Sequence, residues 1–177
     1  MSRLLSKQEE IVHAVDNVSF AIKKGETFTL IGETGSGKTT LGKLVLRLIA
    51  PTEGKIFFKG QNILSLPDEK MRKLRSDMQI IFQDPYASLN PRKTVREILS
   101  LPLSIHTELS KNEKEEKIRT LLDKVGLTPA EKIMDRHPHE FSGGQRQRIV
   151  IARALILRPT FIVADEPVAS GCRGDEK

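Results

Sequence analysis

The sequence has a single cysteine, few aromatic residues and no long apolar run, and each of these absences excludes a class of protein. The lone cysteine, Cys172, excludes an internal disulfide framework and a cysteine-cluster metal site. No stretch reaches the about 18 consecutive apolar residues that a membrane-spanning helix needs. Residues 1–10 lack the apolar segment of a secretory signal. A cytoplasmic protein is therefore expected.

Aromatic rings are too few for an extended surface that stacks on nucleic-acid bases. The 177 residues include seven Phe, one Tyr and no Trp. The net charge of +6 comes from 29 basic and 23 acidic residues, which are intermixed along the chain, as in residues 111–124. A solvated basic surface explains this charge better than a nucleic-acid site does. Phosphate ligands and attraction to a membrane surface remain as smaller alternatives.

Strand and helix patterns alternate along the chain. Apolar residues that alternate or cluster predict strands, and apolar residues spaced three and four apart predict helices. The expected strands cover 18–22, 27–31, 55–59, 78–82 and 161–164, and the expected helices cover 38–49, parts of 92–136, and 143–157. This interleaving predicts an α/β fold with an inserted helical lobe.

Several residues are expected to begin or end these helices. Pro51 should stop the first helix, and Gly126 should end a helix that precedes it. Capping boxes are predicted where Ser110 stands three residues before Glu113 and where Thr128 stands three residues before Glu131. The helix 143–157 is apolar on nearly all sides in its second half and should be mostly buried.

Residues 32–39 read GETGSGKT and fit the phosphate-loop pattern G-x-x-x-x-G-K-[ST]. Glycines let backbone N–H groups face phosphate oxygens, and the N-terminal end of the next helix adds positive charge. Lys38 is expected to reach the β- and γ-phosphates, and Thr39 to bind Mg²⁺. The alternative is a glycine-rich turn before a helix. The expected nucleotide contacts are Gly32, Glu33, Thr34, Gly35, Ser36, Gly37, Lys38, Thr39 and Thr40.

Two acidic residues follow the apolar strand 161–164. An acid at the end of a buried strand lies at the sheet edge where ligands bind in α/β proteins. Asp165 is therefore interpreted as the acid on the magnesium side. Glu166 is interpreted as the group that orients the attacking water or accepts its proton. A solvated strand end is the alternative, and the phosphate loop favours the catalytic interpretation.

Residues 142–145 read SGGQ and open the helix 143–157. Ser142, Gly143, Gly144 and Gln145 combine a hydroxyl, close backbone approach and a helix N-terminus, which together suit an anion. The alternative is an ordinary helix start capped by Ser142. One bound nucleotide is not expected to use two anion-binding elements of the same subunit. This element could therefore face the nucleotide bound by a second copy.

The order of these motifs resembles that of ABC-transporter ATP-binding subunits. The phosphate loop is followed by FQD at 82–84, by FSGGQ at 141–145 and then by the apolar strand with its acidic pair. Residues 79–92 (QIIFQDPYASLNPR) and 137–148 (HPHEFSGGQRQR) are similar to the corresponding sequences in the ATP-binding subunits of oligopeptide and dipeptide importers. The resemblance covers roughly residues 11–168. The base-recognition motif of GTPases, N-K-x-D, is absent.

The resemblance implies a P-loop NTPase core with an antiparallel β subdomain and an inserted helical lobe. The core would comprise residues 11–90 and 158–168, and the lobe with the signature helix residues 91–157. It also implies that Gln83 senses magnesium and water at the γ-phosphate, beside Thr39 and Asp165, and couples the site to the transmembrane partner through the helical lobe. Catalysis would rest on Glu166, Lys38 and Gln83. Residues 142–145 would clamp the ATP bound by the opposite subunit of a head-to-tail dimer.

The sequence departs from the family pattern in three places. Residues 1–19 contain no Phe, Tyr or Trp to stack on adenine, and His13 is the nearest flat ring. The match ends at Val168, and residues 169–177 form an aberrant tail. No switch histidine can be assigned. A later strand of the family is missing, so an incomplete central sheet is expected. A premature stop, a frameshift and a draft gene model are alternative origins of this expected C-terminal truncation.

The resemblance implies an ATPase that uses Mg²⁺ and ATP to energise import of peptides or related small solutes. Its expected partners are transmembrane permease subunits, a second ATPase subunit of the same or another kind, and indirectly a solute-binding protein, with no nucleic acid. The expected location is the cytoplasmic face of the membrane. The alternatives are an inactive fragment and a non-transport ABC ATPase. For this chain alone, weak ATP binding at most and no steady turnover are expected.

Overall fold

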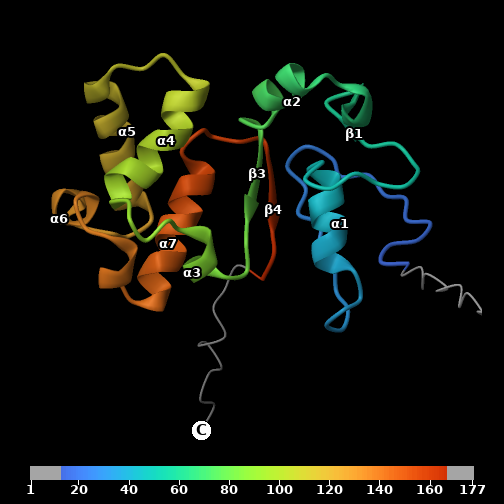
Figure 1. Cartoon of the computed structure of the whole chain (residues 1–177), viewed down its shortest axis with the longest axis horizontal. Coiled ribbons are helices and arrows are strands. Elements are labelled where there is room, and N and C mark those ends of the chain that lie inside the picture. The colour runs from blue at the N-terminus through green and yellow to red at the C-terminus, as the bar shows by residue number, and fades with distance from the viewer. Residues whose placement is uncertain (1–12, 167–177) are drawn as a thin grey trace, which may run out of the picture. The chain divides into compact units, whose positions relative to one another are not determined.

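The computed structural model describes residues 13–166, which belong to two compact units, one ending at Gly54 and the other beginning at Lys55 (Figure 1). Within residues 13–166, no helix combines the length and apolar character needed to cross a bilayer. The elements in chain order are α1 (Lys38–Val45), β1 (Phe57–Phe58), β2 (Gln61–Asn62), a 3₁₀ turn (Ile63–Ser65), α2 (Asp68–Leu74), β3 (Met78–Ile81), α3 (Pro85–Ser88), α4 (Val95–His106), α5 (Lys111–Lys124), α6 (Ala130–Met134), a 3₁₀ turn (Pro138–Glu140), α7 (Gly143–Leu155) and β4 (Phe161–Ala164).

The first unit contains α1 and none of its predicted strands. The ranges 18–22 and 27–31 are both irregular, so the prediction of strands there is wrong. A strand exists only when a neighbour completes its hydrogen-bond ladder, and no neighbouring strand lies within residues 13–54. The Phe20 and Phe28 rings stack 5.0 Å apart, yet both remain partly exposed, and Ile31 is 94% exposed.

Helix α1 ends earlier than predicted, and Pro51 is not the cause. Arg47 takes a left-handed conformation, with φ of 50°. Arg47 N donates to Leu44 O at 2.8 Å, and Leu48 N donates to Lys43 O at 2.9 Å. These paired bonds form a Schellman motif, which satisfies the last carbonyls of a helix as the chain turns away.

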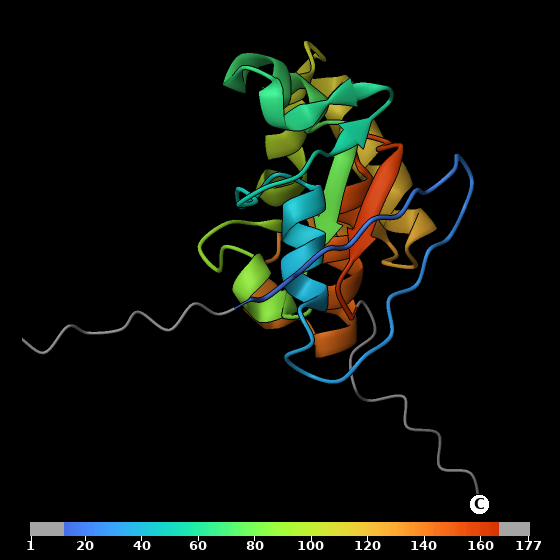
Figure 2. The ribbon, with the colours of Figure 1, turned by 90° about the vertical axis from the view of Figure 1, so that its right-hand side faces the viewer.

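The second unit contains both sheets of the described chain. Strands β3 and β4 pair in parallel, from Met78 opposite Phe161 to Ile81 opposite Ala164, and lie side by side in Figures 1 and 2. The prediction of strand 161–164 is confirmed, and strand 78–82 is shorter by one residue. Within residues 13–166, this parallel sheet has two strands. Strands β1 and β2 form a short antiparallel pair, which covers only part of the predicted strand 55–59.

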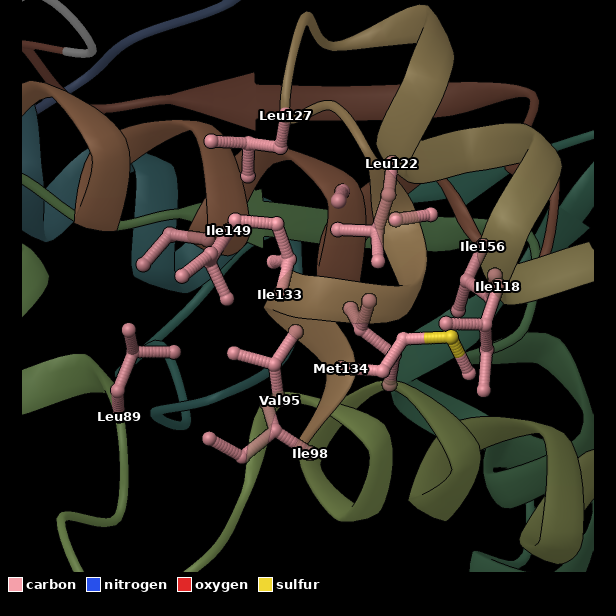
Figure 3. Close-up of a cluster of buried hydrophobic side chains, with 14 of the residues drawn as sticks. Leu89, Val95, Ile98, Ile118, Leu122, Leu127, Ile133, Met134, Ile149 and Ile156 are labelled. Carbon is pink, nitrogen blue, oxygen red and sulfur yellow. The ribbon is translucent and has the colours of Figure 1, made fainter. Parts of the chain in front are cut away.

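The helical lobe has a continuous apolar core, to which α4, α5, α6 and α7 all contribute (Figure 3). On α5, Ile118 and Leu122 are four residues apart and therefore lie on the same, buried face of the helix. The second half of α7 is largely buried, as predicted, and α7 also packs against β3. The fully buried large side chains of this core are Val95, Leu99, Leu103, Ile118, Leu122, Met134, Ile149 and Val150.

Capping boxes start several helices of the lobe. Ser110 caps α5 as predicted, since its Oγ accepts from Glu113 N at 3.4 Å. A second box at the start of α4, formed by Thr94 and Glu97, follows the same spacing and was missed. The predicted box of Thr128 is wrong, because α6 begins one residue later, after Pro129 at the cap position, and has no side-chain cap.

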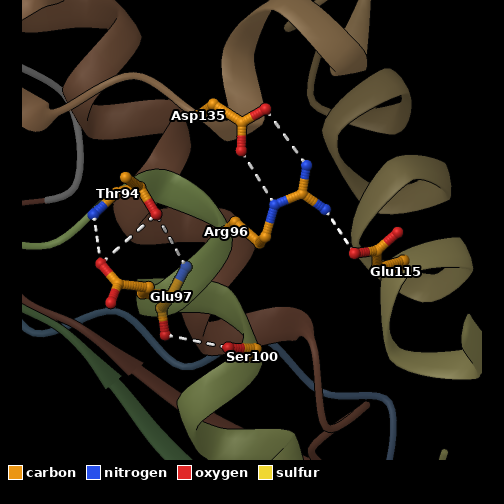
Figure 4. Close-up of polar contacts among 6 residues, drawn as sticks. All are labelled: Thr94, Arg96, Glu97, Ser100, Glu115 and Asp135. Carbon is orange, nitrogen blue, oxygen red and sulfur yellow. Dashed lines mark hydrogen bonds and ion pairs between the residues drawn. The ribbon is translucent and has the colours of Figure 1, made fainter. Parts of the chain in front are cut away.

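Arg96 joins three helices of the lobe (Figure 4). From α4, its Nε donates to Asp135 Oδ1 at 2.9 Å, and its Nη1 donates to Glu115 Oε1 on α5 at 2.6 Å. Asp135 is the residue that ends α6. The hydrogen bond from Arg96 lowers the pKa of Asp135 and raises that of Arg96 itself. The lobe therefore supplements its apolar core with a charged link between helix ends.

Candidate active site

The phosphate loop occupies residues 32–37 and leads directly into α1. Gly35 and Gly37 have φ values of 85° and 86°, in the left-handed region that favours glycine. A Cβ on Gly37 would lie 2.2 Å from the Ala14 carbonyl oxygen, so a side chain does not fit there. A Cβ on Gly35 would meet nothing within 4 Å. The loop conformation thus requires the two glycines for different reasons.

The Lys38 side chain folds back over this loop. Its Nζ donates to Gly32 O and to Glu33 O, both at 2.7 Å, and lies 3.4 Å from Ser36 Oγ. An ammonium group has three donors and no acceptor, so these contacts satisfy it on the loop itself. Because charge-assisted hydrogen bonds to anionic oxygens are stronger, a phosphate can replace the carbonyls as the acceptor.

The chemistry of the loop fits a magnesium-bound polyphosphate. Thr39 is exposed and Thr40 half-buried in the first turn of α1, and Glu33 and Thr34 are exposed on the loop. Backbone N–H groups at a helix N-terminus and a lysine suit phosphate oxygens. A hydroxyl supplies an oxygen ligand of the kind that Mg²⁺ prefers. These residues could therefore hold both groups.

The acidic pair meets the predicted Gln-loop residue at the carboxyl edge of the parallel sheet. Asp165 N donates to Ile81 O at 2.9 Å, which continues the ladder past Ala164. Beyond it, Gln83 Nε2 donates to Glu166 Oε2 at 2.5 Å. The sequence reasoning gave both residues a place in the site but did not predict this contact. A carboxylate held by an amide donor in this way can orient a water molecule or accept its proton.

The SGGQ element begins α7 with a complete capping box. Ser142 Oγ accepts from Gln145 N at 3.3 Å, and Gln145 Oε1 accepts from Ser142 N at 3.0 Å. The interpretation of Ser142 as a helix cap is therefore confirmed. A Cβ on Gly143 or Gly144 would meet nothing within 4 Å. Packing within residues 13–166 does not require these glycines, which leaves room for an external group at the helix start.

Two arginines farther along α7 form hydrogen bonds to the end of α5 and to α3. These contacts were not predicted from the sequence. Arg148 Nη1 donates to Val125 O and Gly126 O, both at 3.1 Å, and so satisfies the end of α5. Arg153 donates to Ser88 O at the end of α3. Burial lowers the pKa of the Arg153 guanidinium. The three arginines between 146 and 153 were the available signal for these contacts.

The predicted site residues are divided between the two units. The phosphate loop, Lys38, Thr39 and Thr40 belong to the first unit. The Gln83, Asp165 and Glu166 cluster and the start of α7 belong to the second. No aromatic residue lies in 13–19. The predicted break at Val168, the tail 169–177 and Cys172 lie outside the described residues.

A glycine-rich loop leading into a helix, together with an acidic pair at the carboxyl edge of parallel strands, defines a P-loop nucleotide-binding protein of the α/β class. The chain belongs to the ABC transporter family, which matches residues 15–169. The family expected from the motif order is thereby confirmed.

Curated relatives from several bacteria are similar over nearly the whole chain. The oligopeptide transport ATP-binding protein AppF of Bacillus subtilis is 54% identical over 96% of this chain and 51% of its own length. The dipeptide transport ATP-binding protein DppF of Haemophilus influenzae is 48% identical over 94% of this chain and 50% of its own length. The chain thus spans about half the length of these relatives.

Solved structures of an ATP-binding cassette, MJ0796, share the fold. The dimeric post-hydrolysis state bound to ADP and phosphate is 34% identical, with a TM-score of 0.82 over 93% of this chain and 70% of that one. A second dimeric structure of the cassette gives a TM-score of 0.81. The P-loop ABC ATPase fold is therefore confirmed.

Proposed function

We propose that this chain provides the ATP-binding and catalytic residues of a subunit that energises peptide import. The observation that carries the proposal is the phosphate loop, in which Gly37 admits no side chain and Lys38 Nζ lies on the loop carbonyls. The names of AppF and DppF, which describe oligopeptide and dipeptide transport, support peptides as the cargo.

Within this proposal, ATP and Mg²⁺ bind where the donor chemistry suits them. Lys38 and the loop amides hold the β- and γ-phosphate oxygens and stabilise the charge that develops on them. Thr39, Asp165 and Gln83 would be the oxygen ligands of Mg²⁺, and the metal would neutralise further phosphate charge. Glu166 accepts a proton from the attacking water, and Gln83 orients Glu166 through the hydrogen bond already described.

We further propose the division into a nucleotide core, residues 11–90 with 158–168, a helical lobe at 91–157 and a tail at 169–177. Residues 142–145 face the nucleotide of a second ATPase subunit, a role that the open space at Gly143 and Gly144 supports. The dimeric cassette structures support pairing of this kind. The other partners are permease subunits and, indirectly, a solute-binding protein, which would place the chain at the cytoplasmic face of the membrane.

For the 177-residue chain alone, we propose weak ATP binding without steady turnover. The apolar segment that leads into the phosphate loop supports this second proposal, because it lacks strand pairing and leaves Leu30 and Ile31 exposed. A loop whose leading segment forms no paired strand is expected to hold its ligand less rigidly.

The test is ATP binding and phosphate release by the purified chain and its variants. Lys38→Ala should weaken binding at least about tenfold, since hydrogen bonds to charged groups contribute about 1.5–3 kcal/mol. Lys43→Ala, which removes another lysine of α1, is the matched control and should change binding little. Equal binding by wild type and Lys38→Ala would contradict nucleotide binding at this loop. Steady phosphate release that is lost in Glu166→Gln would contradict the absence of turnover.

A further inference from the structure

Tyr86 and Arg146 form a contact between the Gln-loop segment and the first turns of α7. The Arg146 guanidinium carbon lies 3.7 Å from the centroid of the Tyr86 ring, and the Arg146 side chain also donates to the Tyr86 hydroxyl. Arg146 Nη1 donates to Pro138 O at 3.2 Å. Its Nε is buried and has no hydrogen-bond partner among the described residues. We name this Tyr86–Arg146 contact the clasp.

One side of the clasp is continuous with the Gln83–Glu166 contact. Asp84 follows Gln83 directly, and its Oδ1 accepts from Tyr86 N at 2.7 Å. Ser88 Oγ donates to Asp84 O at 2.6 Å, which closes the single turn of α3. The backbone of Tyr86 is therefore held in a turn that begins at Asp84, although the residue is 63% exposed.

The other side of the clasp is continuous with the SGGQ element. Arg146 N donates to Ser142 O at 2.9 Å, in the turn that Ser142 and Gln145 cap. A displacement of Arg146 therefore displaces the turn that presents Ser142 and the two glycines. Cation–π contacts of partly exposed arginines are modest in energy, so such a contact can be made and broken as its surroundings change.

We propose that the clasp is a positioning contact that transmits the state of the Gln83–Glu166 pair to the start of α7. When Glu166 loses its hydrogen bond from Gln83, the Gln-loop segment shifts, the clasp loosens, and the first turn of α7 becomes less ordered. Tyr86 and Arg146 thus couple the two parts of the second unit that bear site residues. This inference rests on the proposed function for its purpose, but the coupling itself requires no nucleotide.

The test measures amide hydrogen exchange of Gln145 and Arg146 in the 177-residue chain without nucleotide. Glu166→Ala removes the partner of Gln83 and should raise the exchange rates of these two amides at least about threefold, as expected for local opening. In a Tyr86→Leu background, Glu166→Ala should raise them no further. A response of equal size in both backgrounds, or no response in the wild-type background, would overturn the proposal.

Further variants separate a positioning role from simple packing. Arg146→Gln should abolish the response to Glu166→Ala, as Tyr86→Leu does. Arg148→Gln removes an arginine of the same helix that caps α5 instead, and should leave the response intact. If the clasp served packing alone, Tyr86→Leu would raise exchange along the whole of α7 and would not alter the response to Glu166→Ala.

The only tyrosine of the chain provides a second readout, because no tryptophan is present. Tyr86 emission should change on Arg146→Gln and on Glu166→Ala, and should not change on Arg148→Gln. Unchanged emission on Glu166→Ala would contradict transmission to the clasp. Since both measurements are made without ATP, failure of the coupling and failure of nucleotide binding give different results.

Discussion

The two units of this chain differ in how far they bury their apolar residues. In the second unit, helices close in sequence surround one continuous core, in which Leu122 is 0% exposed. In the first unit, the apolar segments at 18–22 and 27–31 are irregular and partly exposed, and Leu48 on the way out of α1 is 42% exposed. Burial in the helical lobe is completed by nearby sequence, whereas the segments that flank the phosphate loop remain partly exposed within the described residues.

The largest effect is expected when a leucine is truncated to alanine in each unit. Leu122→Ala should cost about 2–5 kcal/mol, because it leaves a cavity in a core that cannot fully collapse. Leu48→Ala, the matched change in the first unit, should cost no more than about 0.5 kcal/mol. Urea unfolding followed by circular dichroism measures both. Similar costs would show that the first unit is as well packed as the second.

A smaller effect is expected from a comparison of two segments in the second unit that share the capping-box sequence pattern. Ser110→Ala removes a capping hydroxyl from α5 and should cost about 1 kcal/mol. Thr128→Ala should stay within about 0.5 kcal/mol, since α6 has no side-chain cap. Thermal or urea unfolding can resolve the difference. A comparable loss of unfolding free energy in Thr128→Ala would show that Thr128 caps α6, as the sequence pattern predicted.

The smallest expected effect concerns the charged link of the lobe. The hydrogen bond from Arg96 lowers the pKa of Asp135 in the folded chain. Its stabilising contribution is therefore present above the unfolded pKa of about 3.9 and is lost as the pH falls through the lower folded value. Asp135→Asn should flatten the fall in unfolding free energy with acidification below about pH 4.

A carboxyl on a neighbouring helix provides the control for this pH effect. Asp123 is exposed on α5 and makes no ion pair within the described residues. Asp123→Asn should leave the pH dependence of unfolding nearly unchanged. If it flattened the curve as much as Asp135→Asn does, the link to Arg96 would not be its source.

Sequence reasoning succeeded where the determining contacts are local. The capping box of Ser110 and the end of α5 at Gly126 follow from residues within one or two turns of each helix. It failed for the strands of the first unit, because pairing depends on distant segments. It also failed for the end of α1, where Arg47 adopts a conformation more typical of glycine.

The candidate site follows the same division. The positions of the phosphate loop and of the acidic pair could be predicted from short motifs whose chemistry is local. The hydrogen bond between Gln83 and Glu166, and the contact between Tyr86 and Arg146, could not be predicted. Each joins residues at least 60 positions apart, and their meeting depends on the parallel pairing of β3 with β4 and on the packing of α7.

The phosphate loop is proposed to form a nucleotide cradle even though the segment leading into it is not a paired strand. Amide hydrogen exchange of residues 32–40, measured with and without ATP and Mg²⁺, tests this claim most directly. Slower exchange across the loop is expected on ATP addition, and this effect should be lost in Lys38→Ala and retained in Lys43→Ala. Unchanged exchange in the wild-type chain, or equal protection in Lys38→Ala, would contradict it.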